Sequence, residues 1–149
     1  MKILLVEDEP HKRDELVDCV ADVFSIVPVI VDGVSTAVTK VLSESFDLII
    51  LDMALSTFGE GADDNQKGHD QAQGGIEVLR ALKAKKRNSK ILIVTQYHNF
   101  YIGGVSVKLK NSQKIIKEKY QQDVIGAVLY QYKSMPTRQK IKAILKANA

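Results

Sequence analysis

The sequence predicts an α/β protein in which a parallel sheet of five strands carries helices on both faces. Short apolar runs typical of buried strands recur along the 149 residues, and segments with helical spacing separate them. Such alternation gives parallel strands, because each right-handed crossover places a helix over the sheet. The length suits one domain, expected to span residues 1–149, and 45% hydrophobic residues supply a core.

The first half of the chain contains two predicted strand and helix pairs. Residues 2–6 form an apolar run that ends in acid, and a helix with Pro10 in its first turn is expected to continue to about Asp22. The run IVPVIV predicts a second strand at a sheet edge, because Pro28 has no N–H for a ladder. Ser35 is expected to cap the next helix.

The remaining elements follow the same alternation. Strands are predicted over FDLIILD, KILIVT and VIGAVLYQY, and helices from Ile76 to about Lys86 and over SQKIIKEKYQQ. Thr137 is expected to cap a last helix. The doubly wound strand order 2-1-3-4-5, called flavodoxin-like, fits best because it places the second strand at an edge. This order puts a ligand crevice at the carboxyl ends of strands one and three.

Acidic residues gather at these strand ends. Glu7, Asp8 and Glu9 follow the first strand, and Asp52 ends the third. Converging carboxylates repel one another unless a hard cation with oxygen ligands neutralises them, and Mg²⁺ is the expected ion. The alternative is structural: the acids after the first strand also suit the positive end of the following helix.

Two further polar residues end the fourth and fifth strands. Thr95 offers a hydroxyl donor, and Lys133 offers a compact positive charge suited to a phosphoryl group. Taken singly, each also fits an ordinary strand or surface residue. His11, His69 and His98 share no metal-ligand spacing and are expected to face solvent.

These segments together resemble the receiver domain of bacterial two-component response regulators. ILLVEDEP is similar to the family's first strand with its acid pair, FDLIILDMAL to its third strand, GGIEVLRALK to its third helix, and ILIVT to the strand that carries a hydroxyl residue. The resemblance implies a phosphoacceptor at Asp52, with Thr95 and Lys133 assisting. It implies Mg²⁺ ligands at Glu7, Asp8, Asp52 and the backbone carbonyl of Ala54, and switch residues at Thr95 and Tyr130.

The sequence departs from that family in two loop expansions and two single positions. Residues 57–74 form a polar, glycine-rich insertion that is expected to be mobile, and residues 96–124 enlarge the region around the fourth helix, where receivers bind partners. Ser134 replaces the family's proline after the lysine, and a cis bond there would cost about 3 kcal/mol. Gln96 replaces a very small residue and is expected to narrow the phosphoryl pocket.

The resemblance implies a signalling phosphoacceptor rather than an enzyme, with a sensor histidine kinase or phosphotransfer protein upstream and an unidentified protein downstream. A homodimer stays open, as does whether the chain is a stand-alone receiver or part of a larger regulator. One alternative is a pseudo-receiver that is never phosphorylated. The other is a Mg²⁺-dependent phosphohydrolase, although Ala54 stands where haloacid-dehalogenase-type enzymes need a second aspartate.

Charge and composition exclude several other classes. A net charge of +3 is spread along the chain, so nucleic-acid binding is not expected. The first residues lack a signal peptide, no apolar run is long enough to span a membrane, and Cys19 has no partner for a disulfide. We therefore expect a cytoplasmic protein. Ala54 and Tyr97 replace polar residues that commonly hold the attacking water, so autodephosphorylation is expected to be slow at most.

Overall fold

The structure, a computed structural model, describes residues 1–55 and 74–149. Its elements in chain order are β1 (Ile3–Val6), α1 (Pro10–Phe24), β2 (Val29–Val31), α2 (Val34–Ser43), β3 (Leu48–Leu51), α4 (Gly74–Ala84), β4 (Lys90–Thr95), β5 (Asn99–Ile102), β6 (Val105–Lys108), η1 (Leu109–Asn111), α5 (Ser112–Tyr120), β7 (Asp123–Leu129) and α6 (Met135–Ala147).

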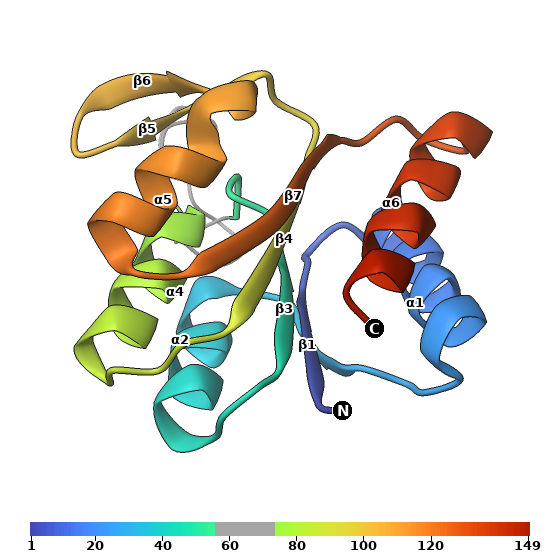
Figure 1. Ribbon diagram of the computed structural model, residues 1–149, viewed down its shortest axis with the longest axis horizontal. Helices are drawn as coiled ribbons and strands as arrows, with labels where there is room; N and C mark the ends of the chain where they lie inside the picture. Colours follow the sequence, from blue (N-terminus) through green and yellow to red (C-terminus); the bar gives the residue numbers. More distant parts are fainter. Residues whose placement is uncertain (56–73) are drawn as a thin grey trace.

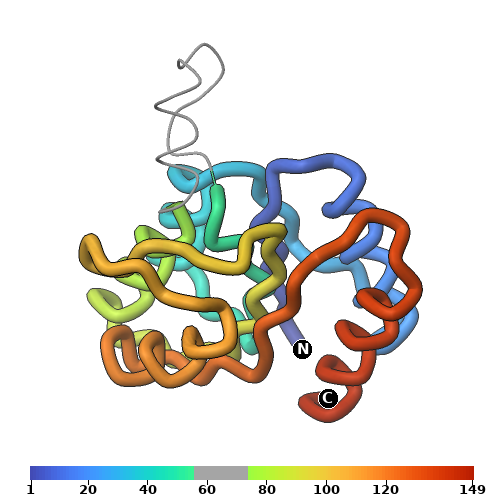
Figure 2. The backbone as a smooth tube through the Cα atoms, turned by 90° about the horizontal axis from the view of Figure 1, so that it is seen from above, coloured from blue at the N-terminus to red at the C-terminus, as the bar shows by residue number. Residues whose placement is uncertain are grey.

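Five of these strands form one parallel sheet in the order β2-β1-β3-β4-β7. The predicted order 2-1-3-4-5 is confirmed, with β7 as the fifth strand of the sheet. Helices α1 and α6 cover one face, and α2, α4 and α5 cover the other (Figure 1). The tube view shows the same division, and the two termini lie close together in both views (Figure 2).

The three central strands β1, β3 and β4 are buried on both faces, so each reads as a continuous apolar run, whereas the edge strand β7 alternates between buried and less buried residues. Alternate residues nevertheless point to opposite sides and build two separate cores. The core under α1 and α6 includes Ile3, Leu5, Ile50, Leu92, Val94 and Leu145. The core under α2, α4 and α5 includes Leu4, Val6, Ile49, Leu51, Ile93 and Ile116.

The predicted expansion at 96–124 contains a β-hairpin that the sequence analysis did not anticipate. Strands β5 and β6 pair antiparallel outside the main sheet, and their ladder ends at the pair Ile102 and Val105. Gly103 and Gly104 form the two-residue turn with φ of 57° and 79°, a conformation that favours glycine at both positions. The hairpin lies beside α5 in the ribbon view (Figure 1).

Three predicted element starts need correction. Pro28 precedes β2 rather than lying within it, although β2 is an edge strand as expected. Gly33, not Ser35, is the N-cap of α2. Ser134, not Thr137, caps α6: its hydroxyl accepts the Thr137 N–H at 3.3 Å, because Ser134 still has the extended backbone that a cap requires.

The insertion predicted at 57–74 lies outside the described residues except for Gly74, which begins α4. This glycine and Gly75 press against the segment after β3. A Cβ on Gly74 would come within 2.0 Å of the Leu55 carbonyl oxygen, and one on Gly75 within 2.7 Å of the Met53 Cα. The start of α4 therefore fixes the backbone that follows Asp52. Across residues 1–55 and 74–149, no helix combines the length and apolar character needed to cross a membrane.

Candidate functional site

Three acidic side chains meet at the carboxyl ends of β1 and β3. Val6 pairs with Leu51 across the two strands, so the residues that follow, Glu7 and Asp52, emerge side by side. Carboxylate oxygens of Glu7, Asp8 and Asp52 all lie within 4.8 Å of one another. Glu7 and Asp52 are buried, with 1% and 6% of their surfaces exposed. The predicted acidic cluster is therefore present.

Backbone donors hold two of these carboxylates in place. The Oε2 atom of Glu7 accepts the N–H groups of Asp8 at 3.1 Å and Glu9 at 3.0 Å. The Oδ1 atom of Asp52 accepts the Ala54 N–H at 2.9 Å. These hydrogen bonds stabilise the charged form of each carboxylate. They leave Glu7 Oε1 and Asp52 Oδ2 free of backbone donors, so these two oxygens can face a cation.

Glu9 has a structural role. Its carboxylate caps α1 by accepting the N–H groups of His11 at 3.1 Å and Lys12 at 2.6 Å. The alternative that acids after the first strand serve the helix start is correct for this residue. Pro10 occupies the first turn of the helix, as predicted.

The cation at this cluster is Lys12, which the sequence analysis did not single out. Its Nζ atom lies 2.6 Å from Glu7 Oε1 and 3.0 Å from Asp52 Oδ2, and its side chain is fully buried. The sequence contains a signal for the burial of Lys12, because this residue precedes Leu16 and Val20 at helical spacing, on the face that packs inward. A lysine in such a stripe needs a buried counter-charge.

Burial favours the protonated form of Glu7. Loss of contact with water raises the pKa of Glu7 to about 7, even though the nearby Lys12 ammonium acts to lower it. The Asp52 carboxylate adds to the upward shift by repulsion. In the metal-free cluster Glu7 therefore keeps its proton up to about pH 7.

This donor set fits a magnesium ion. When all three carboxylates are ionised, the one ammonium leaves two negative charges, which a divalent cation would balance. Mg²⁺ takes oxygen ligands, uses one or two carboxylates and keeps several waters. Asp8 is partly exposed, which leaves a path for a hydrated ion to the cluster.

Thr95 lies at the end of β4 and Lys133 follows β7, the strands at whose ends the sequence analysis placed them. Thr95 ends β4, is buried, and its hydroxyl accepts the Tyr97 N–H at 3.4 Å. Lys133 is exposed, and its Nζ lies 5.3 Å from the centre of the Tyr132 ring. Among the described residues, no hydrogen bond or ion pair joins either side chain to Asp52. Gln96 is exposed, and the peptide bond before Ser134 is trans.

Tyr130 connects the cluster to the turn before α6. It follows β7 and is buried, and its hydroxyl donates to Glu15 Oε2. Glu15 Oε1 accepts the Lys133 N–H at 3.0 Å, and Lys12 Nζ lies 5.6 Å from the centre of the Tyr130 ring. Burial and this hydrogen bond raise the pKa of Tyr130. A continuous set of contacts thus runs from Asp52 to the turn at Lys133.

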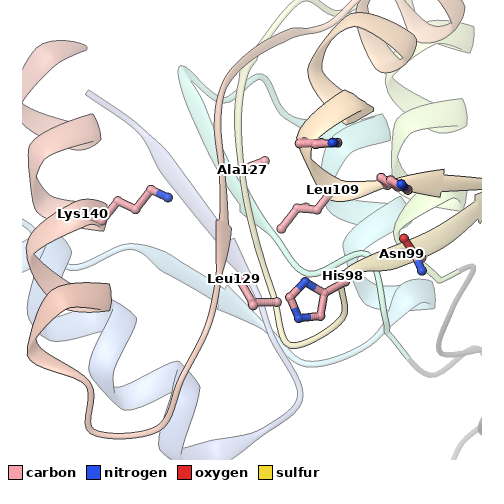
Figure 3. A pocket seen from close by; sticks show the side chains of 8 residues that line it. His98, Asn99, Leu109, Ala127, Leu129 and Lys140 are labelled. Atoms are coloured by element: carbon pink, nitrogen blue, oxygen red, sulfur yellow. The ribbon is translucent and has the colours of Figure 1, made fainter.

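A groove of about 540 Å³ lies between the hairpin, β7 and α6. Leu109, Ala127 and Leu129 form its apolar part, and Figure 3 shows Lys140 extending toward it from α6. The remaining lining residues are polar or basic: His98, Asn99, Lys108 and Lys110. His98 and His11 are exposed, as predicted, whereas His69 is outside the described residues.

Comparison with known proteins identifies relatives over nearly the whole chain. No protein-family model matches. The Detocs response regulatory protein DtcB of Vibrio alginolyticus is 33% identical over 153 residues, which cover 97% of this chain and 99% of that protein. The protein of the same name from Enterobacter cloacae is 28% identical over 90% of this chain and 91% of its own.

Solved structures show the same fold. The response regulator TrrA of Thermotoga maritima, in complex with Mg²⁺ and beryllium fluoride, superposes with a TM-score of 0.56 at 20% identity, covering 97% of this chain and 99% of that one. The response regulator domain of Thermotoga maritima CheB gives a TM-score of 0.62 at 17% identity, covering 99% and 92%. These relatives are signalling proteins. The chain belongs to the family of the Detocs response regulatory protein DtcB, and it is a phosphoacceptor receiver domain of two-component signalling.

Proposed function

We propose that Asp52 is the residue on which this receiver domain accepts its phosphoryl group, with Mg²⁺ bound beside it. The observation that carries the proposal is the shared position of Asp52, Glu7 and Asp8, whose oxygens lie within 4.8 Å of one another. Glu7, Asp8, Asp52 and the Ala54 carbonyl would hold the ion. When bound, Mg²⁺ supplies positive charge to the oxygens of the transferring group.

For the transfer, the protein has to position the reacting groups and stabilise the charge on the phosphoryl oxygens. An Asp52 oxygen forms a bond to phosphorus while the bond from phosphorus to the donor breaks, and the bonding electrons leave with the donor atom. Asp52 is suited to this role because it is held by the Ala54 N–H and paired with a buried ammonium. No general base is needed, because the nucleophile is already a carboxylate.

Partners follow from the same assignment. A sensor histidine kinase or a phosphotransfer protein would supply the phosphoryl group, and another protein would read the phosphorylated state. The groove beside α6 is a suitable docking surface, because it is lined by both lysines and apolar side chains and so fits an acidic segment that carries an apolar residue. We expect the protein to act in the cytoplasm, where the buried thiol of Cys19 stays reduced.

Phosphorylation can be tested directly. The protein would be incubated with acetyl phosphate and Mg²⁺, and the intact mass measured with peptide mapping. We expect one added phosphoryl group on Asp52 and none in Asp52→Asn. Asp32→Asn is a matched control, because Asp32 follows β2 at the same sheet edge but is exposed.

Each alternative predicts a different result in this experiment. A pseudo-receiver would take up no phosphoryl group under any condition, and wild-type protein that stays unmodified would support it. A phosphohydrolase would release phosphate over many turnovers. Stable modification of Asp52→Asn at another residue would refute the assignment of the acceptor.

A further inference from the structure

We propose that the C-terminal halves of α4 and α5 form a second ligand site, which binds a small organic molecule through a phosphate group. The site is separate from the acidic cluster. Helix α4 begins beside the segment after Asp52 and is 11 residues long, about 16 Å, and the proposed site is at its far end. The inference therefore goes beyond the proposed function and does not depend on which residue accepts the phosphoryl group.

The shape of this region is the first argument. Helices α4 and α5 lie side by side on one face of the sheet (Figure 1). Between them is a hollow of about 430 Å³, lined by Arg80, Lys83, Ala84, Lys119 and Tyr120. Small-molecule sites typically have volumes of roughly 300 to 1,000 Å³. The wall of the hollow is mostly apolar, so it can contact the carbon skeleton of a ligand.

Charge gives the second argument. Three cationic side chains line the hollow, and no acidic side chain of the described residues does. Glu77 accepts a hydrogen bond from Arg80 at 2.7 Å and offsets one of these charges, so two positive charges remain. A phosphate monoester carries about 1.5 to 2 negative charges at pH 7 and balances them, whereas a carboxylate would balance only one.

Backbone contacts hold two of the cations in place. The Nζ atom of Lys83, on α4, donates to the backbone carbonyl of Lys119, on α5, at 2.9 Å. An ammonium has three N–H donors, so this contact leaves two for an anion. The ammonium of Lys119 lies against the hairpin turn, since a Cβ on Gly103 would be 2.6 Å from it. The two lysines are therefore positioned before a ligand arrives.

The hydroxyl of Tyr120 is an independent indication of a polar ligand. Tyr120 is 3% exposed, and its hydroxyl has no hydrogen-bond partner within the described residues. A buried donor without a partner costs free energy. Burial raises the pKa of this hydroxyl and the Arg80 guanidinium acts to lower it, so the two groups are near one another. Both can donate to the same phosphate.

The side chain of Arg80 can turn toward such a ligand. It is 57% exposed, and its partner Glu77 is 45% exposed. Exposed ion pairs contribute little to stability, whereas a guanidinium can bind phosphate through two parallel N–H groups. A phosphate that enters the hollow therefore draws Arg80 away from Glu77 and exposes the Tyr120 hydroxyl.

A series of three probes tests the site. Phenyl phosphate, phenol and inorganic phosphate would each be titrated into the wild-type protein by calorimetry, in EDTA so that no metal ion occupies the acidic cluster. We expect phenyl phosphate to bind saturably and about tenfold more tightly than inorganic phosphate, and phenol not to bind. Amide chemical shifts should change at residues 80–84 and 119–121.

Substitutions at one lysine test the charge requirement. We expect Lys83→Gln to weaken phenyl phosphate binding by about tenfold and Lys83→Arg, which keeps the charge, to bind within about threefold of wild type. Lys85→Gln is the matched control, because Lys85 is exposed just after α4 and does not line the hollow. It should bind like wild type.

A separate substitution tests the hydroxyl. Tyr120→Phe keeps the buried ring and should weaken binding of phenyl phosphate by about tenfold, because a hydrogen bond to a charged acceptor is lost. The melting temperature of the ligand-free variant should not fall, since the hydroxyl has no partner to lose. A lower melting temperature with unchanged binding would give the hydroxyl a structural role only and overturn its role in the site.

Other outcomes would overturn the proposal as a whole. These are the absence of saturable phenyl phosphate binding up to about 10 mM, binding as tight in Lys83→Gln as in Lys85→Gln, or equally tight binding of phenol. Equal affinity for inorganic phosphate and phenyl phosphate would overturn the organic part of the ligand. Each of these results leaves the assignment of Asp52 intact, because that assignment is tested by phosphoryl uptake in the presence of Mg²⁺.

Discussion

The ammonium group of Lys12 lies 3.0 Å from the carboxylate of Asp52, in a position where both side chains are almost completely buried. The two residues come from different elements, the first turn of α1 and the end of β3. Their contact brings a cation to the proposed phosphoacceptor before any metal ion is present. The site is therefore partly neutralised by the protein itself, and a bound Mg²⁺ would balance the remaining carboxylate charge.

Removal of Asp8 is expected to weaken magnesium binding. An ion that binds only the folded state raises the free energy of unfolding by mass action. We expect Mg²⁺ to raise the melting temperature of wild type by several degrees, about 1 to 2 kcal/mol of stabilisation, and that of Asp8→Ala by less than half as much. Differential scanning calorimetry with and without Mg²⁺ measures this. Asp32→Ala is the control, and an equal shift in Asp8→Ala would remove Asp8 from the ligand set.

Stability of the metal-free protein is expected to depend on Glu7. Its pKa is raised to about 7 in the folded state from 4.5, so the folded protein keeps a proton that the unfolded chain has lost. The stabilisation by this proton is complete below pH 4.5 and is lost as the pH rises to about 7, with a change of up to about 3 kcal/mol. Urea unfolding in EDTA across this range should show the decline.

Substitution provides the matching control for the pH experiment. Glu7→Gln cannot ionise, so its stability should change less between pH 4.5 and 7 than that of wild type. Glu118→Gln alters an exposed glutamate on α5 and should keep the wild-type profile. Parallel profiles for wild type and Glu7→Gln would show that Glu7 does not titrate in this window.

The Tyr130 hydroxyl is expected to stabilise the turn before α6. Tyr130→Phe keeps the ring beside Lys12 and removes only the hydrogen bond to Glu15, which also binds the Lys133 N–H. Loss of a bond to a charged acceptor should lower the free energy of unfolding by about 1 to 3 kcal/mol. Amide exchange at residues 131–134 should become faster.

Tyr132→Phe is the control for that substitution, because Tyr132 lies in the same turn but is exposed. If Tyr130 is the switch residue that the family resemblance implied, phosphorylation should change exchange in this turn in wild type and change it much less in Tyr130→Phe. If amide exchange in Tyr130→Phe matched that of wild type both before and after phosphorylation, both roles would be contradicted.

The fold was predictable because its main signals are local and repeated. Five apolar runs alternate with helical segments, and an edge position for β2 selected the strand order. The hairpin β5–β6 was missed although its Gly103-Gly104 turn is a strong hairpin signal. Its strands are four residues long and lie outside the main sheet, so the alternation of strands and helices does not predict them.

The candidate site was predictable only as far as strand ends determine it. Glu7 and Asp52 follow paired strands, so their proximity follows from topology. The contact of Lys12 with Glu7 and Asp52 was not predictable from spacing alone, because a lysine on an inward helix face shows its role only once its buried counter-charges are known. Whether a side chain in a turn points inward depends on backbone angles such as the φ of 52° at Lys133, and sequence spacing does not encode these.

Hydrolysis of the phosphorylated protein is expected to be slow for a receiver domain. Water must be aligned with phosphorus opposite the Asp52 oxygen, and polar side chains two residues after the acceptor and two after the hydroxyl residue commonly hold it. Here these residues are Ala54, which is buried and has no hydrogen-bonding side chain, and Tyr97, which is about half exposed. The Tyr97 N–H is bound to the Thr95 hydroxyl, which fixes the start of this segment close to the end of β4.

Substitutions at the two positions test the argument. Ala54→Asn and Tyr97→Glu each restore a polar side chain, and we expect at least one of them to shorten the lifetime of phosphorylated Asp52 by about tenfold, because an aligned water lowers the barrier by roughly 1.4 kcal/mol. Decay would be followed by intact mass after removal of the phosphodonor. Tyr101→Glu, which changes an exposed tyrosine on the hairpin, is the control. Decay within seconds in wild type, with no acceleration in either variant, would show that these side chains do not control the attacking water.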